Sequence, residues 1–166
     1  RVAIDQSLSR LARGGELIRV GRGLYVRPVE TRFGKRAPSV EATLEGIAQT
    51  RSEKIVPHGA AAANALGLTT QVPVKPIFLT SGRPRTLRIG GRTVELRHAA
   101  GWQFAPRGER AGEVVRAMAW IGRERAAETL NALRPRLSAS ERAELVAARG
   151  KMPTWMAEQM SRLVDG

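Results

Sequence analysis

The residues of this chain best suited to chemistry are polar and basic side chains near its amino-terminal end. On a helix over residues 2–13, one amide, one hydroxyl and two guanidinium groups would share the polar side at about 100° per residue. These groups belong to Gln6, Ser9, Arg10 and Arg13. Such groups can hydrogen-bond to base edges and phosphates in the major groove of DNA. The spacing therefore favours nucleic-acid recognition over catalysis.

An amphipathic helix must position these polar groups. Ile4, Leu8 and Leu11 fall on its other side and form one apolar stripe at helical spacing. The glycine pair at residues 14–15 predicts the end of the helix, because glycine is the residue that most often ends a helix.

A basic hairpin is expected directly after this helix. Apolar runs flank residues 21–23, and the glycines there can supply the positive φ of a tight turn. Arg22 would lie at the tip. A helix followed by a basic hairpin is typical of a winged helix, in which phosphate contacts fix the register while the helix contacts bases. The alternative is an ordinary helix and hairpin with solvated arginines.

The charge balance supports a polyanionic partner. The chain has 166 residues, with 28 Lys and Arg against 15 Asp and Glu, and a formal net charge of +13. Arginine dominates the basic residues, which favours phosphate and guanine partners, although GC-rich coding also enriches arginine. The basic residues concentrate in two regions, 1–38 and 83–98.

We predict an α+β fold with two parts. Two prolines and a glycine interrupt any regular period between residues 28 and 38, which indicates a linker. The expected parts are a truncated N-terminal winged helix (recognition helix plus β-wing) at 1–28, a linker at 29–38, and a mixed α/β domain with a helical C-terminal tail at 39–166. A complete helix-turn-helix has two more helices before the recognition helix, and the first residue is Arg. We therefore expect the chain to be a fragment that lacks part of its DNA-binding domain.

The second part combines a small sheet with helices. Ser39 is a candidate N-cap for a helix from residue 40 to about residue 49. The predicted sheet lies within residues 54–98, and its elements are strands at 54–57 and 76–80, an alanine-rich helix at 59–66 between them, and a hairpin at 87–97. Small side chains would let the alanine-rich helix lie close against the sheet. Asn64 could satisfy backbone groups or serve a partner surface. From residue 109 the pattern is helical, with segments at 126–133, up to 148, and 155–163.

The sequence offers little support for an enzyme. It contains no cysteine, and its two histidines, His58 and His98, lie 40 positions apart. Glu95-Leu-Arg97 is only weakly similar to a nuclease motif. The glycines at 21 and 23 lack the third glycine of a dinucleotide fingerprint. We expect no enzymatic activity, no cofactor and no metal. No apolar run approaches the roughly 18 residues of a membrane span, so we expect a cytoplasmic protein without a membrane partner.

Two long motifs resemble a known family. Ser7–Pro28 and Pro57–Pro73, with Phe78–Gly82 and Arg85–Gly90, are similar to AbiEi-type antitoxins of the DUF6088-type branch, which are transcriptional regulators of type IV toxin-antitoxin and abortive-infection operons. This resemblance implies a regulator that represses its own operon through an inverted repeat in double-stranded DNA. It also implies a neighbouring nucleotidyltransferase-like toxin. The residues that the resemblance carries over are Gln6, Ser9, Arg10, Arg13, Arg19, Arg22 and Arg27.

Two other functions stay open at this point. Residues 39–166 could form a protein-interaction module that binds the toxin or another subunit. Alternatively, the arginine-rich strands could bind RNA, although few aromatic residues lie near them for base stacking.

Overall fold

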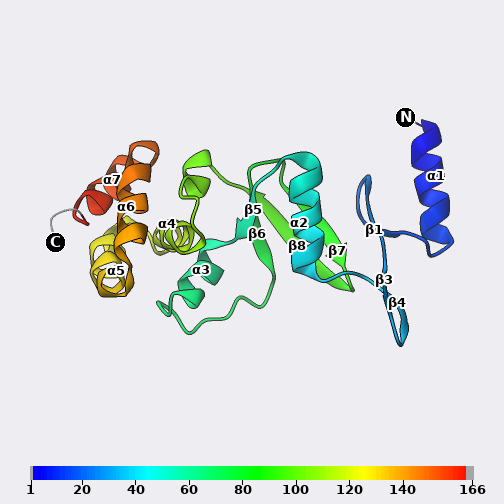
Figure 1. Cartoon of the computed structure of the whole chain (residues 1–166), viewed down its shortest axis with the longest axis horizontal. Coiled ribbons are helices and arrows are strands. Elements are labelled where there is room, and N and C mark those ends of the chain that lie inside the picture. The colour runs from blue at the N-terminus through cyan, green and yellow to red at the C-terminus, as the bar shows by residue number, and fades with distance from the viewer. Residues whose placement is uncertain (1, 164–166) are drawn as a thin grey trace. The chain divides into compact units, whose positions relative to one another are not determined.

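The computed structural model describes residues 2–163, which form a mixed α/β protein with seven α-helices and three small sheets (Figure 1). The chain divides into two compact units. The sheet unit comprises the residues up to Ile55 together with Lys75–His98, and the helical unit comprises Val56–Val74 together with the residues from Ala99 onward. The mixed α/β class is as predicted. None of the described helices has the length and hydrophobicity that a bilayer-spanning helix needs.

The predicted helix and hairpin open the sheet unit. Helix α1 covers Val2–Arg13, and strands β1 (Ile18–Gly21) and β2 (Leu24–Val26) pair antiparallel. Gly15 and Gly23 adopt positive φ values of 75° and 65°, which are accessible to glycine, at the end of the helix and in the turn. Both elements lie where the glycine pattern predicts them.

One side chain of β1, that of Val20, lies in the core next to a bulge. The pairing shifts between Arg19 and Gly21, so Val20 has no partner of its own on β2. Alternation along the strand puts Val20 on the same face as Ile18, which also packs against this core. Val20 is only 2% exposed and is the only buried residue among residues 2–39. Gly21 permits the approach, because a Cβ there would lie 2.8 Å from Leu87 Cδ2.

Residues 29–38, expected as a linker, carry a second hairpin. Strands β3 (Val29–Thr31) and β4 (Gly34–Arg36) pair antiparallel around a two-residue turn. The Thr31 hydroxyl donates to the Gly34 carbonyl at 2.8 Å and accepts from the Phe33 N–H at 3.2 Å. Gly34 closes the turn with a φ of 99°. The glycine that suggested an irregular segment is therefore part of a turn.

A four-stranded sheet and one helix complete this unit. The sheet has the order β5-β6-β8-β7, with β6 parallel and β7 antiparallel to β8. Its strands are β5 (Ile55–Pro57), β6 (Ile77–Thr80), β7 (Arg85–Ile89) and β8 (Arg92–His98). Helix α2 (Val40–Arg51) starts at the predicted N-cap, since the Ser39 hydroxyl accepts from the Ala42 N–H at 3.1 Å. The core consists of Val20, Leu44, Ile47, Leu87, Ile89, Val94 and Leu96.

The described part of the helical unit contains five helices. They are α3 (Gly59–Ala65), α4 (Glu109–Ile121), α5 (Ala126–Leu133), α6 (Ala139–Ala148) and α7 (Thr154–Ser161). Short 3-10 turns join α4 to α5, α5 to α6 and α6 to α7. Ser138 and Glu141 form a capping box at the start of α6. The predicted helical tail from residue 109 is confirmed.

The partner of the alanine-rich helix α3 differs from the expectation. We expected its small residues to lie against the sheet, but Ala62, Ala63 and Leu66 belong to the core of the helical unit, where α3 packs on α4. Small side chains favour close packing without specifying the partner, so the pattern was compatible with either surface. The Asn64 amide donates to the carbonyls of Thr69 and Gln71, both at 3.2 Å, and so satisfies backbone groups.

A half-buried carboxylate ties three segments of the sheet unit together. Glu53, just before β5, accepts from Arg85 Nη2 at 2.7 Å and from the Thr80 hydroxyl at 3.1 Å. Gly82 leaves room for it, because a Cβ there would run into the carboxylate. Burial alone would raise the pKa of Glu53, but hydrogen bonds from Arg85 and Thr80 and the positive charges of Arg85 and Arg51 outweigh it and lower that pKa.

We expect Gly59→Ala to destabilise the helical unit by about 1–3 kcal/mol, the usual cost of overpacking. The new methyl would meet the Arg116 carbonyl and lie 2.6 Å from Trp120 Cβ, so α4 would have to move. Gly46→Ala is the matched control, because no atom lies within 4 Å of its Cβ position, and alanine there should stabilise α2 by about 0.5–1 kcal/mol. Thermal unfolding followed by circular dichroism measures both. Equal melting temperatures for the two variants would contradict the close approach of α3 and α4.

We also expect Glu53 to make stability depend on acid pH. Its pKa is lower in the folded chain than in the unfolded chain, so its contribution is complete above the ordinary glutamate range, at about pH 4.3, and is lost as the pH falls through the lower folded value. Glu53→Gln should cost about 1–3 kcal/mol at pH 7, because Arg85 loses a charged acceptor. The free energy of unfolding, measured from pH 7 to pH 3, should converge between wild type and this variant at the acid end. The exposed Glu158→Gln serves as control, and a constant difference between wild type and Glu53→Gln at every pH would refute the assignment.

Candidate nucleic-acid interface

The β1–β2 hairpin uses its two faces for different contacts. Its apolar face, which includes Val20, packs into the core of the sheet unit. On the opposite face, Arg19 and Tyr25 are cross-strand partners. The Tyr25 hydroxyl lies 3.3 Å from the Ser9 hydroxyl of α1, within hydrogen-bond distance. The hairpin therefore positions α1 through a side chain that alternates with those in the core.

A cavity of about 500 Å³ lies between α1 and this hairpin, lined by Ser9, Arg13, Arg19 and Tyr25 among others. The Arg13 Nε donates to the Ser9 carbonyl at 3.4 Å, and the Arg19 Nε donates to the Gly21 carbonyl at 3.4 Å. Two guanidinium groups and two hydroxyls thus line one recess, a combination that suits phosphate oxygens.

The other predicted site residues lie outside this recess. Gln6 and Arg10 are exposed on α1, and Arg22 is exposed at the hairpin tip. Arg27, just after β2, is also exposed and lines two smaller cavities. Of the seven predicted residues, only Ser9 is half-buried, because it contacts the hairpin. It is therefore less available to a partner than its place on the helical wheel indicated.

The apolar stripe of α1 is open. No residue of α1 is buried, and Ile4 and Leu11 are 64% and 36% exposed. The half-buried residues of the helix are Leu8, Ser9 and Ala12, so Ile4, Leu11 and the arginines remain accessible while Leu8 of the predicted stripe is partly covered.

A second cationic surface, not predicted from the sequence, lies on the β3–β4 hairpin. The Arg32 guanidinium lies 4.6 Å and the Arg36 guanidinium 5.7 Å from the centroid of the Phe33 ring, distances typical of cation–π contacts. Phe33 is 71% exposed at the turn. The sequence does contain a hairpin signal here, namely two short segments on either side of Arg32-Phe33 with a glycine directly after Phe33. The neighbouring prolines favoured a linker instead.

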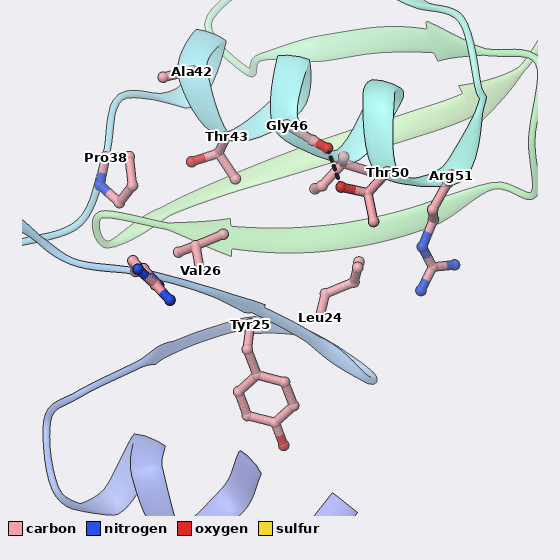
Figure 2. Close-up of a pocket in the computed structure, with 11 residues that line it drawn as sticks. Leu24, Tyr25, Val26, Pro38, Ala42, Thr43, Gly46, Thr50 and Arg51 are labelled. Carbon is pink, nitrogen blue, oxygen red and sulfur yellow. Dashed lines mark hydrogen bonds between the residues drawn. The ribbon is translucent and has the colours of Figure 1, made fainter. Parts of the chain in front are cut away.

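A pocket of about 270 Å³ separates β2 from α2 (Figure 2). Figure 2 shows Leu24 and Val26 directed to the α2 side of β2 and Tyr25 directed to α1. The Thr43 hydroxyl in this lining is buried and has no hydrogen-bond partner among residues 2–163, whereas the Thr50 hydroxyl donates to the Gly46 carbonyl at 2.7 Å. The lining residues include no Asp, Glu, His or Cys, so they form an apolar recess rather than a catalytic constellation.

The histidines and the weak nuclease motif occupy structural positions. His58 Nδ1 accepts from the Ala60 N–H at 3.2 Å and caps α3, while His98 Nδ1 lies 2.8 Å from the Gly82 carbonyl. Arg97 donates to Glu95 at 2.7 Å, and this hydrogen bond and the carboxylate charge raise the pKa of Arg97. Within residues 2–163, no three His, Cys, Asp or Glu side chains are grouped to hold a metal ion.

One buried charge in the helical unit also escaped prediction. Arg116 on α4 is 4% exposed, and burial lowers its pKa, opposed by the charges of Glu113 and Glu109. Burial, together with the charge of Glu109, raises the pKa of Glu113. The Arg116 guanidinium lies over Gly112, one turn earlier, where a Cβ would be 2.8 Å from Nη1. Gly112 is the sequence feature that could have indicated the position of this guanidinium group.

The comparisons place this chain by family alone. No curated protein and no solved structure matches it. A family model does match, over residues 2–141, which include α1, both hairpins, the four-stranded sheet and most of the helical unit. The chain belongs to the DUF6088 family, a family of unknown function.

Proposed function

We propose that this protein is a DNA-binding transcriptional regulator that contacts duplex DNA through α1 and the β1–β2 hairpin. The observation that carries the proposal is the recess between them, where Arg13 and Arg19 lie together with two hydroxyl groups. Arginine pairs of this kind suit phosphate oxygens and guanine edges. Arg22 at the tip adds a third exposed cation.

Helix and hairpin have different roles in this proposal. Gln6, Arg10 and Arg13 project from one exposed side of α1 and would contact base edges. Arg19, Arg22 and Arg27 would contact phosphates, which fix orientation without carrying sequence information. The Ser9–Tyr25 contact supports this division, because it ties the base-contacting helix to the phosphate-contacting hairpin.

The finer proposal is an antitoxin of a type IV, AbiE-like system that represses its own operon through an inverted repeat. It rests on the resemblance of residues 7–28 and 57–73 to AbiEi-type antitoxins. A nucleotidyltransferase-like gene beside this one, whose product stops growth unless this protein is co-expressed, would support it. Normal growth with the neighbouring gene expressed alone would count against it.

A protein-interaction module is the second candidate, favoured by exposed apolar side chains. Val72 and Val74 in the helical unit are largely exposed, as are Val2 and Ile4 on α1. Exposed apolar side chains gathered in one segment are candidates for a protein-binding patch. Co-purification of the neighbouring gene product with the whole chain, lost on Val72→Ser with Val74→Ser, would favour this candidate.

We expect the protein to bind DNA from upstream of its own reading frame more tightly than a random duplex of equal length. Arg13→Gln should lower this preference, since a bidentate guanine contact contributes about 1–3 kcal/mol of discrimination. Arg22→Gln should weaken both duplexes alike and reduce the slope of log K against log salt by about 0.9, the value for one phosphate contact. Fluorescence anisotropy over a salt series measures these quantities.

Arg123→Gln is the charge-matched control, because Arg123 is exposed and belongs to the helical unit, whereas the proposed interface belongs to the sheet unit. It should leave affinity and salt slope unchanged. Equal binding of the upstream and random duplexes at every salt concentration would refute sequence-specific recognition. Equal losses for Arg13→Gln, Arg22→Gln and Arg123→Gln would indicate attraction by net charge alone.

A further inference from the structure

The tip of the β3–β4 hairpin exposes an aromatic ring among cations. Phe33 has 71% of its surface in solvent, although a phenylalanine side chain gains about 1.5–3 kcal/mol from full burial. Two guanidinium groups, those of Arg32 and Arg36, lie against its ring. All six strand residues of this hairpin are exposed. The hairpin thus leaves most of the ring exposed to solvent.

The turn holds this ring in a defined place. The Thr31 hydroxyl accepts from the Phe33 N–H and donates to the Gly34 carbonyl, so one side chain spans the turn. Gly34 adopts a φ of 99°, a conformation that other residues rarely take. The geometry at the tip is therefore set by local hydrogen bonds.

The charge of the hairpin favours a polyanion. Lys35 lies directly opposite Glu30 in the strand register, so these two charges offset each other. Arg32 and Arg36 have no acidic residue opposite them, and both lie beside the ring. Phosphates would satisfy the two guanidinium groups, and an apolar wedge between base steps is a common companion of such contacts in the minor groove.

We propose that the β3–β4 hairpin is a second DNA-binding element, in which Phe33 inserts as a wedge into the minor groove while Arg32 and Arg36 contact the flanking phosphates. This inference rests on the proposed function, because α1 would occupy the major groove. A helix in the major groove combined with a short basic segment in the adjacent minor groove is a known arrangement. The hairpin would add affinity, and its wedge would bend the duplex.

The test compares Phe33→Ala, Phe33→Leu, Arg32→Gln and Arg36→Gln with wild type on the upstream duplex. Phe33→Ala should weaken binding about tenfold or more at unchanged salt slope, since the lost contact is apolar. Phe33→Leu should retain most of the affinity, because leucine also serves as a wedge. Each arginine variant should instead reduce the slope by about 0.9. Energy transfer between dyes at the duplex ends should report a bend with wild type and Phe33→Leu that is lost with Phe33→Ala.

The outcomes separate the two proposals. If the wild type binds the duplex and Phe33→Ala binds and bends it equally well, this inference is overturned and the proposed function still stands. No wild-type binding to duplex DNA would overturn both. A loss for Phe33→Ala on single-stranded RNA but not on duplex DNA would also overturn the inference. Arg123→Gln is again the charge control, and the melting temperatures of all tip variants should match wild type because the tip is exposed.

Discussion

The attachment of residues 2–39 to the core of the sheet unit depends on the apolar face of the β1–β2 hairpin. Val20 is the only buried residue among residues 2–39, and the half-buried Ile18, Leu24 and Val26 pack against the same core around Leu87 and Leu96. Two features permit the contact of Val20, the alternation that puts it on the same face as Ile18 and a glycine at position 21 that lets the strand approach Leu87. A segment with so little buried surface has low local stability, as expected of a surface that adapts to a partner.

Side chains alternate between the two faces of β2, so the hairpin contacts the core on one face and α1 on the other. Leu24 and Val26 face α2, whereas Tyr25, between them, faces α1 and meets Ser9 (Figure 2). A one-residue slip in this strand would therefore exchange the two faces and remove both contacts at once. The proposed DNA-contacting helix is positioned by a strand whose register is fixed from the core.

Local signals predicted most of the elements, and contacts between distant residues account for the misses. The end of α1 and the start of α2 follow from Gly14-Gly15 and Ser39, because caps and turns depend on a few neighbouring residues. Which surface α3 packs on, and which arginine is buried, depend on partners far along the chain. The residues proposed for the candidate site were chosen from the sequence. The contact that partly buries Ser9 could not be chosen in this way, because it depends on Tyr25, sixteen residues later. The β3–β4 hairpin was missed for another reason, because Gly34 is compatible both with an irregular linker and with a tight turn.

The two units interleave along the chain, and this makes it difficult for recombination to exchange one unit without the other. Each unit is assembled from two separate stretches, with the chain passing between them after residues 55, 74 and 98. A single recombination crossover anywhere between residues 55 and 99 would split at least one unit, since residues from both of its stretches are needed for its core. Exchange of one intact unit between relatives requires several coordinated crossovers. Selection would then act on the two units as one inherited block, whatever partner each of them binds.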